Sequence, residues 1–261
     1  MAETATARRG RPPSHTSERR GLKSTDTGSR ILCALAADGP LGLTELAFAG
    51  SVGVSTAHRH LAGFIEAGLV RQAGSGGHYD LGPVSLQIGL AALSRLDVVA
   101  LAEPKLRDLA DGTGFTALLS VWSDRGPTIV RWQRAPLPFV TSLGLGSVLP
   151  ATRSATGLAF LAFLPRAVTA EVVARERGRE VDARQLADFR STRLATVDGT
   201  VIPGLSAIAS PALDLQGEAA AVVTLIGADK AFADGDASAN RRLLQATSGL
   251  SAALGYRSKD E

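Results

Sequence analysis

Near the start of the chain, apolar residues recur every three or four positions in three short blocks, which is the period of an α-helix. The first block, TGSRILCALAADG at 27–39, is followed by proline, and a glycine-proline pair ends a helix. The second block, LTELAFAG at 43–50, has Thr44 in the position of a helix cap. The third block, VSTAHRHLAGFIEAGLV at 54–70, has one apolar and one polar face. We therefore predict three short helices, the last two joined by the tight turn GSVG at 50–53.

Residues 69–83, LVRQAGSGGHYDLGP, show a different pattern, with two short strand-like segments around a glycine-rich tip. This pattern is typical of a β-hairpin. Three helices closed by a hairpin form a winged helix-turn-helix, which places one helix in the major groove of DNA. We assign this domain to residues 25–84, a linker helix to 85–100, and a disordered basic tail to residues 1–24, which lack apolar periodicity.

The remaining residues, 101–261, alternate between strand-like and helix-like patterns and predict one α+β domain of the kind found in sensors. The helical pattern that follows the hairpin is interrupted between Asp97 and Glu103. We predict strands at 115–124, 127–134, 206–215 and 219–228, an extended segment at 139–150, and helices at 154–165, 167–177, 182–194 and 236–256.

Positive charge is concentrated at the N-terminus. The whole chain has a formal net charge of +3, whereas residues 1–30 contain seven Lys or Arg against three Asp or Glu, a balance of +4. A basic tail on a near-neutral body fits a polyanion partner and a solvated leader equally well. No apolar run is long enough for a membrane helix or a secretory signal, so we expect a cytoplasmic protein without membrane contact. Cys33 is the one cysteine, which excludes an internal disulfide and a cysteine metal site.

The third predicted helix carries His58 and His60, two of the chain's four histidines. Residues two apart on a helix point about 200° away from each other, so these histidines cannot hold one metal ion or act as a catalytic pair. The outward positions are Ser55, Thr56, His58 and Arg59, while His60 lies at the boundary of the apolar face. Such side chains at a helix start can bond base edges and phosphates, although an isolated helix with this face is as often simply solvated. The helix before it and the hairpin after it favour DNA recognition.

The stretch from 43 to 83, LTELAFAGSVGVSTAHRHLAGFIEAGLVRQAGSGGHYDLGP, resembles the DNA-binding domain of IclR-type bacterial transcriptional regulators. The matching residues are Leu43–Ala47, Ser55-Thr56, His58-Arg59, Leu61, Ala67–Val70 and Tyr79–Gly82. The resemblance continues through 93–114 and 149–165, covers roughly residues 25–255, and is most specific in the first 80 of those. The resemblance implies a homodimer or a tetramer of dimers on a pseudo-palindromic double-stranded operator. It also implies a linker helix that mediates dimer contacts and a C-terminal domain of GAF-like fold that binds a small-molecule effector.

Two departures from the family pattern affect the expected DNA surface. Gly53-Val54 stand where the family usually has Pro-Lys, and His60 replaces a usual leucine, which changes the expected base preference but not the fold. In the tail, RRGRPP contains the core of a minor-groove arm, with Arg9 and Arg11 as its arginines, although so short a match is common by chance. The residues we expect to bind DNA in the folded domain are Thr44, Ser55, Thr56, His58, Arg59, Arg71 and His78.

The resemblance places the effector against the start of the helix at 154–165 and against the late strands. Relatives that bind small keto-acids use polar residues at positions that match Val197, Ala207, Thr224 and Ile226, and three of those four polar groups are absent here. Because burying a small carboxylate without donors is unfavourable, we expect a larger, mostly apolar and aromatic effector. The expected effector-binding residues are Trp122, Phe139, Leu149, Ser154, Ala155, Thr156, Val197, Ala207, Thr224 and Ile226. Trp132 and Leu143 are further candidate walls and Ser206 is a further polar group, while core packing is the more common role for any single aromatic side chain.

The sequence contains few residue patterns that could support catalysis. The last histidine is His78, so the C-terminal region cannot supply a Ser-His-Asp arrangement, and it contains no phosphate loop or dinucleotide motif. We therefore expect a regulator without metal or cofactor, a repressor by default, with an activator as the alternative. A second alternative is a DNA-binding protein whose C-terminal domain only oligomerises.

Overall fold

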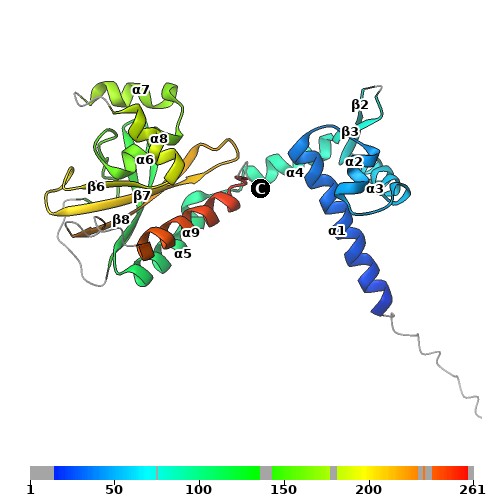
Figure 1. Cartoon of the computed structure of the whole chain (residues 1–261), viewed down its shortest axis with the longest axis horizontal. Coiled ribbons are helices and arrows are strands. Elements are labelled where there is room, and N and C mark those ends of the chain that lie inside the picture. The colour runs from blue at the N-terminus through cyan, green and yellow to red at the C-terminus, as the bar shows by residue number, and fades with distance from the viewer. Residues whose placement is uncertain are drawn as a thin grey trace, which may run out of the picture. The chain divides into compact units, whose positions relative to one another are not determined.

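The computed structural model describes residues 15–257 apart from 75, 136–142, 177–180, 229–231 and 233–236. The chain divides into two compact units, Met1–Arg95 and Leu96–Glu261 (Figure 1). The division falls inside the stretch 85–100, in which the sequence places a linker. Among the described residues, no helix is long and apolar enough to cross a membrane.

The N-terminal unit contains the predicted helices and hairpin. Ile31, Leu35, Leu46, Ala57 and Leu61, from three successive helices, are buried in one core, so the apolar faces read from the sequence do meet. Strand β3 lies between β1 and β2 and runs antiparallel to both. This arrangement is a winged helix-turn-helix, as predicted. Its elements are α1 (His15–Asp38), β1 (Leu41–Gly42), α2 (Leu43–Ala49), α3 (Val54–Glu66), β2 (Val70–Ala73), β3 (His78–Leu81) and α4 (Pro83–Leu93).

Two local predictions for this unit are wrong, and one strand was missed. Helix α1 begins at His15, so residues 15–24 are helical rather than disordered. Extending a helix that is already anchored in a core is far easier than starting one, and it needs no apolar periodicity. Thr44 is not the cap of α2, because the helix follows Gly42, whose N–H donates to Glu45 Oε2 at 2.7 Å. Strand β1 is two residues long and leaves no periodic signal.

The C-terminal unit is an α+β domain around one antiparallel sheet with the strand order β5-β4-β8-β7-β6. The four predicted strands and four predicted helices that follow α5 are all present. The short edge strand β6 was missed. The elements are α5 (Val98–Thr113), β4 (Thr116–Ser123), β5 (Gly126–Gln133), α6 (Ala155–Phe163), α7 (Arg166–Arg175), α8 (Ala183–Thr192), β6 (Ala195–Asp198), β7 (Leu205–Leu213), β8 (Ala219–Ala228) and α9 (Ala237–Ala253).

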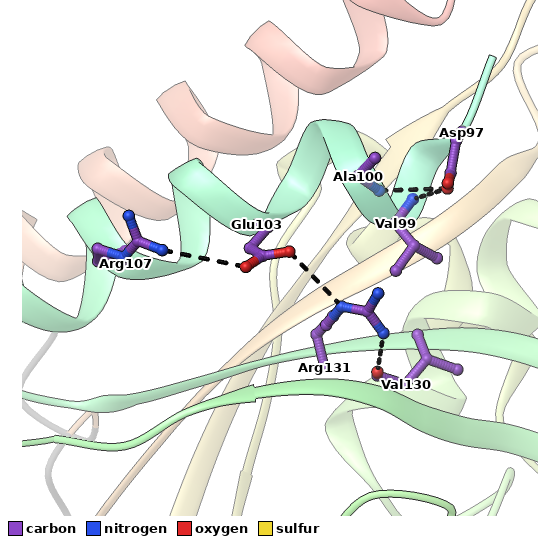
Figure 2. Close-up of polar contacts among 7 residues, drawn as sticks. All are labelled: Asp97, Val99, Ala100, Glu103, Arg107, Val130 and Arg131. Carbon is purple, nitrogen blue, oxygen red and sulfur yellow. Dashed lines mark hydrogen bonds and ion pairs between the residues drawn. The ribbon is translucent and has the colours of Figure 1, made fainter. Parts of the chain in front are cut away.

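Helix α5 begins earlier than the sequence predicted. The Asp97 carboxylate caps it by accepting from Val99 N at 2.9 Å and Ala100 N at 3.2 Å (Figure 2). Glu103, which we placed in a break, lies inside the helix, and its carboxylate is 3.9 Å from Nε of Arg131 on β5. Exposed ion pairs of this kind contribute at most about 1 kcal/mol. The position of α5 on the sheet therefore depends mainly on its apolar contacts.

Helices cover both faces of the sheet (Figure 1). Helices α5 and α9 lie on one face, and α6 lies on the other. Because side chains alternate along a strand, Val223 and Leu225 of β8 pack with α5 and α9, whereas Val222 and Thr224 face α6. The face toward α6 therefore carries the residues that the sequence singled out for effector binding.

Candidate functional site

The polar side chains of α3 gather at its N-terminus, away from its buried face. Ser55, His58 and Arg59 are exposed, and Thr56 is half-buried. The Arg59 Nη2 group donates to Thr56 Oγ1 over 3.4 Å, so these two side chains lie together. The structure thus brings the four α3 residues of the expected DNA surface onto one accessible part of the helix.

The other expected DNA-binding residues lie on α2 and the hairpin. Thr44 is exposed in the first turn of α2. Arg71 on β2 lies 2.6 Å from the Asp80 carboxylate on β3, so its charge is partly compensated. His78 Nδ1 lies 3.0 Å from the carbonyl oxygen of Gly76, within the turn. Arg9 and Arg11 lie outside the described residues.

The structure explains why a histidine is tolerated at position 60. His60 is half-buried, and its ring centroid lies 6.0 Å from that of Phe64, one turn later in α3. Helix α1 passes close by at Gly28, where an added Cβ would come within 2.8 Å of Phe64 Cζ and 3.7 Å of His60 Nδ1. His60 therefore sits at the edge of the contact between the two helices, where its polar ring atoms need not be fully buried.

A cavity in the C-terminal unit is lined by most of the expected effector-binding residues. It lies beside the start of α6 and the neighbouring strands. The expected residues that line it are Leu149, Ser154, Ala155, Thr156, Val197, Ala207, Thr224 and Ile226. Leu143 and Ser206, which the sequence also offered, line it as well. The lining residues that the sequence did not indicate are Leu118, Val201, Ile202 and Leu205.

The structure does not bring Trp122 to this cavity, and of the two roles open to this side chain it favours core packing. The Trp122 side chain is on the same face of β4 as Leu118, but four residues further on, a distance of about 13 Å along a strand. There it packs edge-on against Phe160 of α6, with ring centroids 5.5 Å apart. Trp122 therefore belongs to the core under α6. Phe139, the other expected aromatic wall, lies outside the described residues.

The polar groups of the cavity are hydroxyls and the start of α6. Thr156 Oγ1 and Thr224 Oγ1 lie 2.8 Å apart, and each residue is only 1% exposed. Ser154 caps α6, because its Oγ accepts from Gly157 N at 2.9 Å and donates to the Pro150 carbonyl oxygen at 2.6 Å. A helix N-terminus carries a partial positive charge, so this end of the cavity suits an electron-rich ligand group.

The rest of the cavity is aliphatic and narrow. None of the described residues that line it is ionisable. The volume open to water-sized molecules is only about 40 Å³, against roughly 300–1,000 Å³ for typical small-molecule pockets. In this conformation the apolar walls therefore lie close together, and a ring-sized ligand would have to move them apart.

These features together are the architecture of transcriptional regulators that join a winged helix to a domain with an internal ligand cavity. Among the described residues, no group of three or more His, Cys, Asp or Glu could hold a metal ion. The family model for the IclR helix-turn-helix domain matches residues 24–74, and that for the C-terminal domain of bacterial IclR transcriptional regulators matches residues 90–252. The chain belongs to the IclR family, which is a family of regulators and not of enzymes.

Individual relatives agree with this assignment. The transcriptional repressor IclR of Escherichia coli K12 is 32% identical over 169 residues, which are 63% of this chain but only 62% of that protein. The regulator BhcR of Paracoccus denitrificans is 28% identical over 84% of this chain and 82% of its own length. Among solved structures, Pseudomonas aeruginosa HmgR is 35% identical with a TM-score of 0.79, over 91% of this chain and 100% of that one.

Proposed function

We propose that this protein is a DNA-binding transcriptional repressor that responds to a small, mostly apolar, aromatic molecule. The observation that carries the DNA-binding part is the accessible group of Ser55, His58 and Arg59 at the start of α3, the recognition helix of a winged helix-turn-helix. Repression is supported by the name of the Escherichia coli relative, a transcriptional repressor.

The start of α3 enters the major groove, where Arg59 bonds a guanine edge and Ser55, Thr56 and His58 bond neighbouring base or phosphate groups. Thr44, at the start of α2, contacts a phosphate. Two hairpin residues and two tail arginines complete the DNA surface. Arg71 and His78 contact the backbone from the wing, and Arg9 and Arg11 contact the minor groove.

The effector occupies the cavity beside α6. Its apolar body is surrounded by aliphatic side chains such as Leu149 and Ile226, and its polar group meets the Thr156 and Thr224 hydroxyls and the start of α6. The absence of a lining cation argues against a small, highly charged acid, because burying a carboxylate without a charged partner is unfavourable. An aromatic ring supplies a large apolar area with one polar substituent.

The protein acts as a homodimer or a tetramer of dimers, with α4 at a contact between copies. Leu86, Ile88 and Leu90 of α4 are 63%, 58% and 56% exposed in the single chain. A helix that is apolar all round is normally buried, and a second copy of α4 would cover these side chains. A dimer would present two α3 helices to the two halves of a pseudo-palindromic operator.

Regulation follows from a shift between two arrangements of the protein. The narrow cavity represents one of them, and an aromatic ligand that holds the walls apart favours the other. If the second arrangement spaces the two α3 helices differently, the operator no longer fits. A ligand can act in this way only by binding one arrangement more tightly than the other.

DNase footprinting of the region upstream of the protein's own gene tests DNA binding. Arg59→Ala should weaken operator binding by about 1–3 kcal/mol, because a bidentate base contact is lost. Arg184→Ala, which removes an exposed charge from α8 in the other unit, should leave it unchanged. If operator affinity is indifferent to Arg59, α3 is not the recognition helix.

The effector is tested by adding phenylacetate, phenylacetamide and benzhydrazide, with glyoxylate and pyruvate as small-acid controls. An aromatic compound should release operator DNA and raise the melting temperature of the protein, because a ligand that binds the folded state stabilises it. A response to the small acids alone would contradict the aromatic assignment. If neither a wider set of aromatic compounds nor a wider set of small acids changes operator binding or the melting temperature, the C-terminal domain only oligomerises.

A further inference from the structure

A basic groove runs between α1 and the start of α3, next to the proposed recognition surface. Its lining includes Lys23, Asp26 and Arg30 from α1, Ser51 from the turn before α3, and Thr56 and Arg59 from α3 itself. Thr56 and Arg59 belong both to this groove and to the DNA-reading part of α3. Any duplex seated on the start of α3 therefore has the mouth of the groove beside it.

The charges of the groove favour an anion. Lys23, Arg30 and Arg59 contribute three positive charges against the single negative charge of Asp26. Arg30 lies 2.7 Å from the Asp26 carboxylate and donates through Nη1 to Ser51 Oγ at 3.3 Å, which holds its guanidinium at the turn. Lys23 makes no ion pair with any other residue whose side chain the structure describes, and it is exposed.

The first turn of α3 needs cations from elsewhere. Gly53, Val54, Ser55 and Thr56 provide none, and Val54 is 47% exposed with an apolar side chain. A major-groove helix normally has phosphates at both edges of the groove, and phosphate contacts fix its position on the duplex. Outside α3, Arg30 of α1 reaches the turn before this helix, where its Nη1 donates to Ser51 Oγ.

We propose that Lys23 and Arg30 form a second phosphate-binding surface, which holds the DNA backbone beside the half-site read by α3. This inference rests on the proposed DNA-binding function and adds a role for α1. The contact is sequence-independent, since phosphates carry no base identity. It therefore sets the strength and salt dependence of binding, while Arg59 sets the base preference.

The test is fluorescence anisotropy with operator and unrelated duplexes at several salt concentrations, using full-length wild-type, Lys23→Ala, Arg30→Ala and double variants. Each lost phosphate contact lowers the salt slope by about 0.9, so the affinity ratio between 50 and 200 mM salt should shrink about threefold per contact. The loss should be equal on both duplexes, unlike that of Arg59→Ala. Arg184→Ala serves as the charge-matched control.

Ethylation interference gives a second measurement, in which the double variant should lose sensitivity at phosphates flanking each half-site. Arg30→Ala removes the ion pair with Asp26 and could therefore affect the fold of the N-terminal unit. Lys23→Ala breaks none of the described ion pairs, so a change in its DNA binding reports the lost charge alone. If the double variant binds the operator with the affinity and the salt slope of the wild type, the phosphate-binding role of Lys23 and Arg30 is wrong, while the proposed function remains intact. A lower oligomer mass of the variants in sedimentation would assign the groove to a contact between copies instead. If the wild type itself binds no operator, both proposals are wrong.

Discussion

The hydroxyl pair in the cavity leads to a quantitative prediction. Thr156 Oγ1 and Thr224 Oγ1 are 2.8 Å apart and almost completely buried, so each hydroxyl depends on the other. Thr224→Val keeps the shape of the side chain but leaves the Thr156 hydroxyl without this partner, which should destabilise the C-terminal unit by about 1–3 kcal/mol. Thr156→Val should have a similar effect. Removing both hydroxyls leaves no stranded polar group, so the double variant should be much less destabilised than the sum of the single ones.

The chain offers a direct assay. Its two tryptophans, Trp122 and Trp132, lie on β4 and β5, so their fluorescence reports unfolding of the C-terminal unit. Urea unfolding of the wild type, both single variants and the double variant gives a coupling energy, which should be about 1–3 kcal/mol in size. Thr196→Val on the edge strand β6 is the matched control, because Thr196 is exposed and its hydroxyl is free to bond water.

Additive effects of the two substitutions would refute this reasoning. They would mean that each hydroxyl finds its own partner, and that the short contact between them contributes nothing. Single variants as stable as the wild type would refute it as well, because a buried unpaired hydroxyl must then be tolerated. Either result would also remove the pair as a polar handle for the proposed effector.

Three further predictions concern other parts of the chain. Gly157→Ala should prevent correct folding of the C-terminal unit, because its Cβ would lie 2.3 Å from the Ala151 carbonyl oxygen, and thermal melts followed by tryptophan fluorescence measure this. Gly63→Ala has no atom within 4 Å of the added Cβ, so it should stabilise the N-terminal unit by about 0.5–1 kcal/mol in melts followed by circular dichroism. The Glu176 carboxylate accepts from Ala151 N and Thr152 N, so Glu176→Ala should speed amide hydrogen exchange at 151–157 without changing that of the N-terminal unit. Leu86→Glu should lower the oligomer mass in sedimentation; an unchanged mass would place the interface elsewhere.

The spacing of apolar residues was sufficient to predict a helix or strand that is long enough to show its own buried face. The apolar positions of α2 and α3 and the glycine-rich tip of the hairpin predicted their elements correctly. Strands β1 and β6, of two and four residues, are too short to establish a period and depend on the strands they pair with. The early start of α1 was missed because residues 15–24 show no apolar periodicity in the sequence.

The residues that line the cavity could be predicted where the family resemblance gave matching positions, but not where the lining comes from loops. Thr156 and Thr224 are 68 residues apart in sequence, and only their alignment to the family pattern brought them together before the structure did. Val201 and Ile202 follow β6 in a loop without periodic signal, so they were missed as walls. Strand alternation identifies the face of the sheet on which Trp122 lies but not its distance along the strand, so the sequence could not decide between a cavity wall and the core.

Helix α6 is held at both ends by charged side chains from the segments that follow it. Glu176, just after α7, accepts from Ala151 N and from both N and Oγ1 of Thr152 in the loop before α6, and Arg190 of α8 donates to the Ala162 carbonyl oxygen in its last turn. Neither charged residue lines the cavity. Glu176 fixes the loop from which α6 starts, and Arg190 satisfies a carbonyl that the helix end leaves unpaired. The α7–α8 segment therefore sets the position of the polar end of the cavity, and ligand affinity should respond to substitutions there that touch no ligand atom.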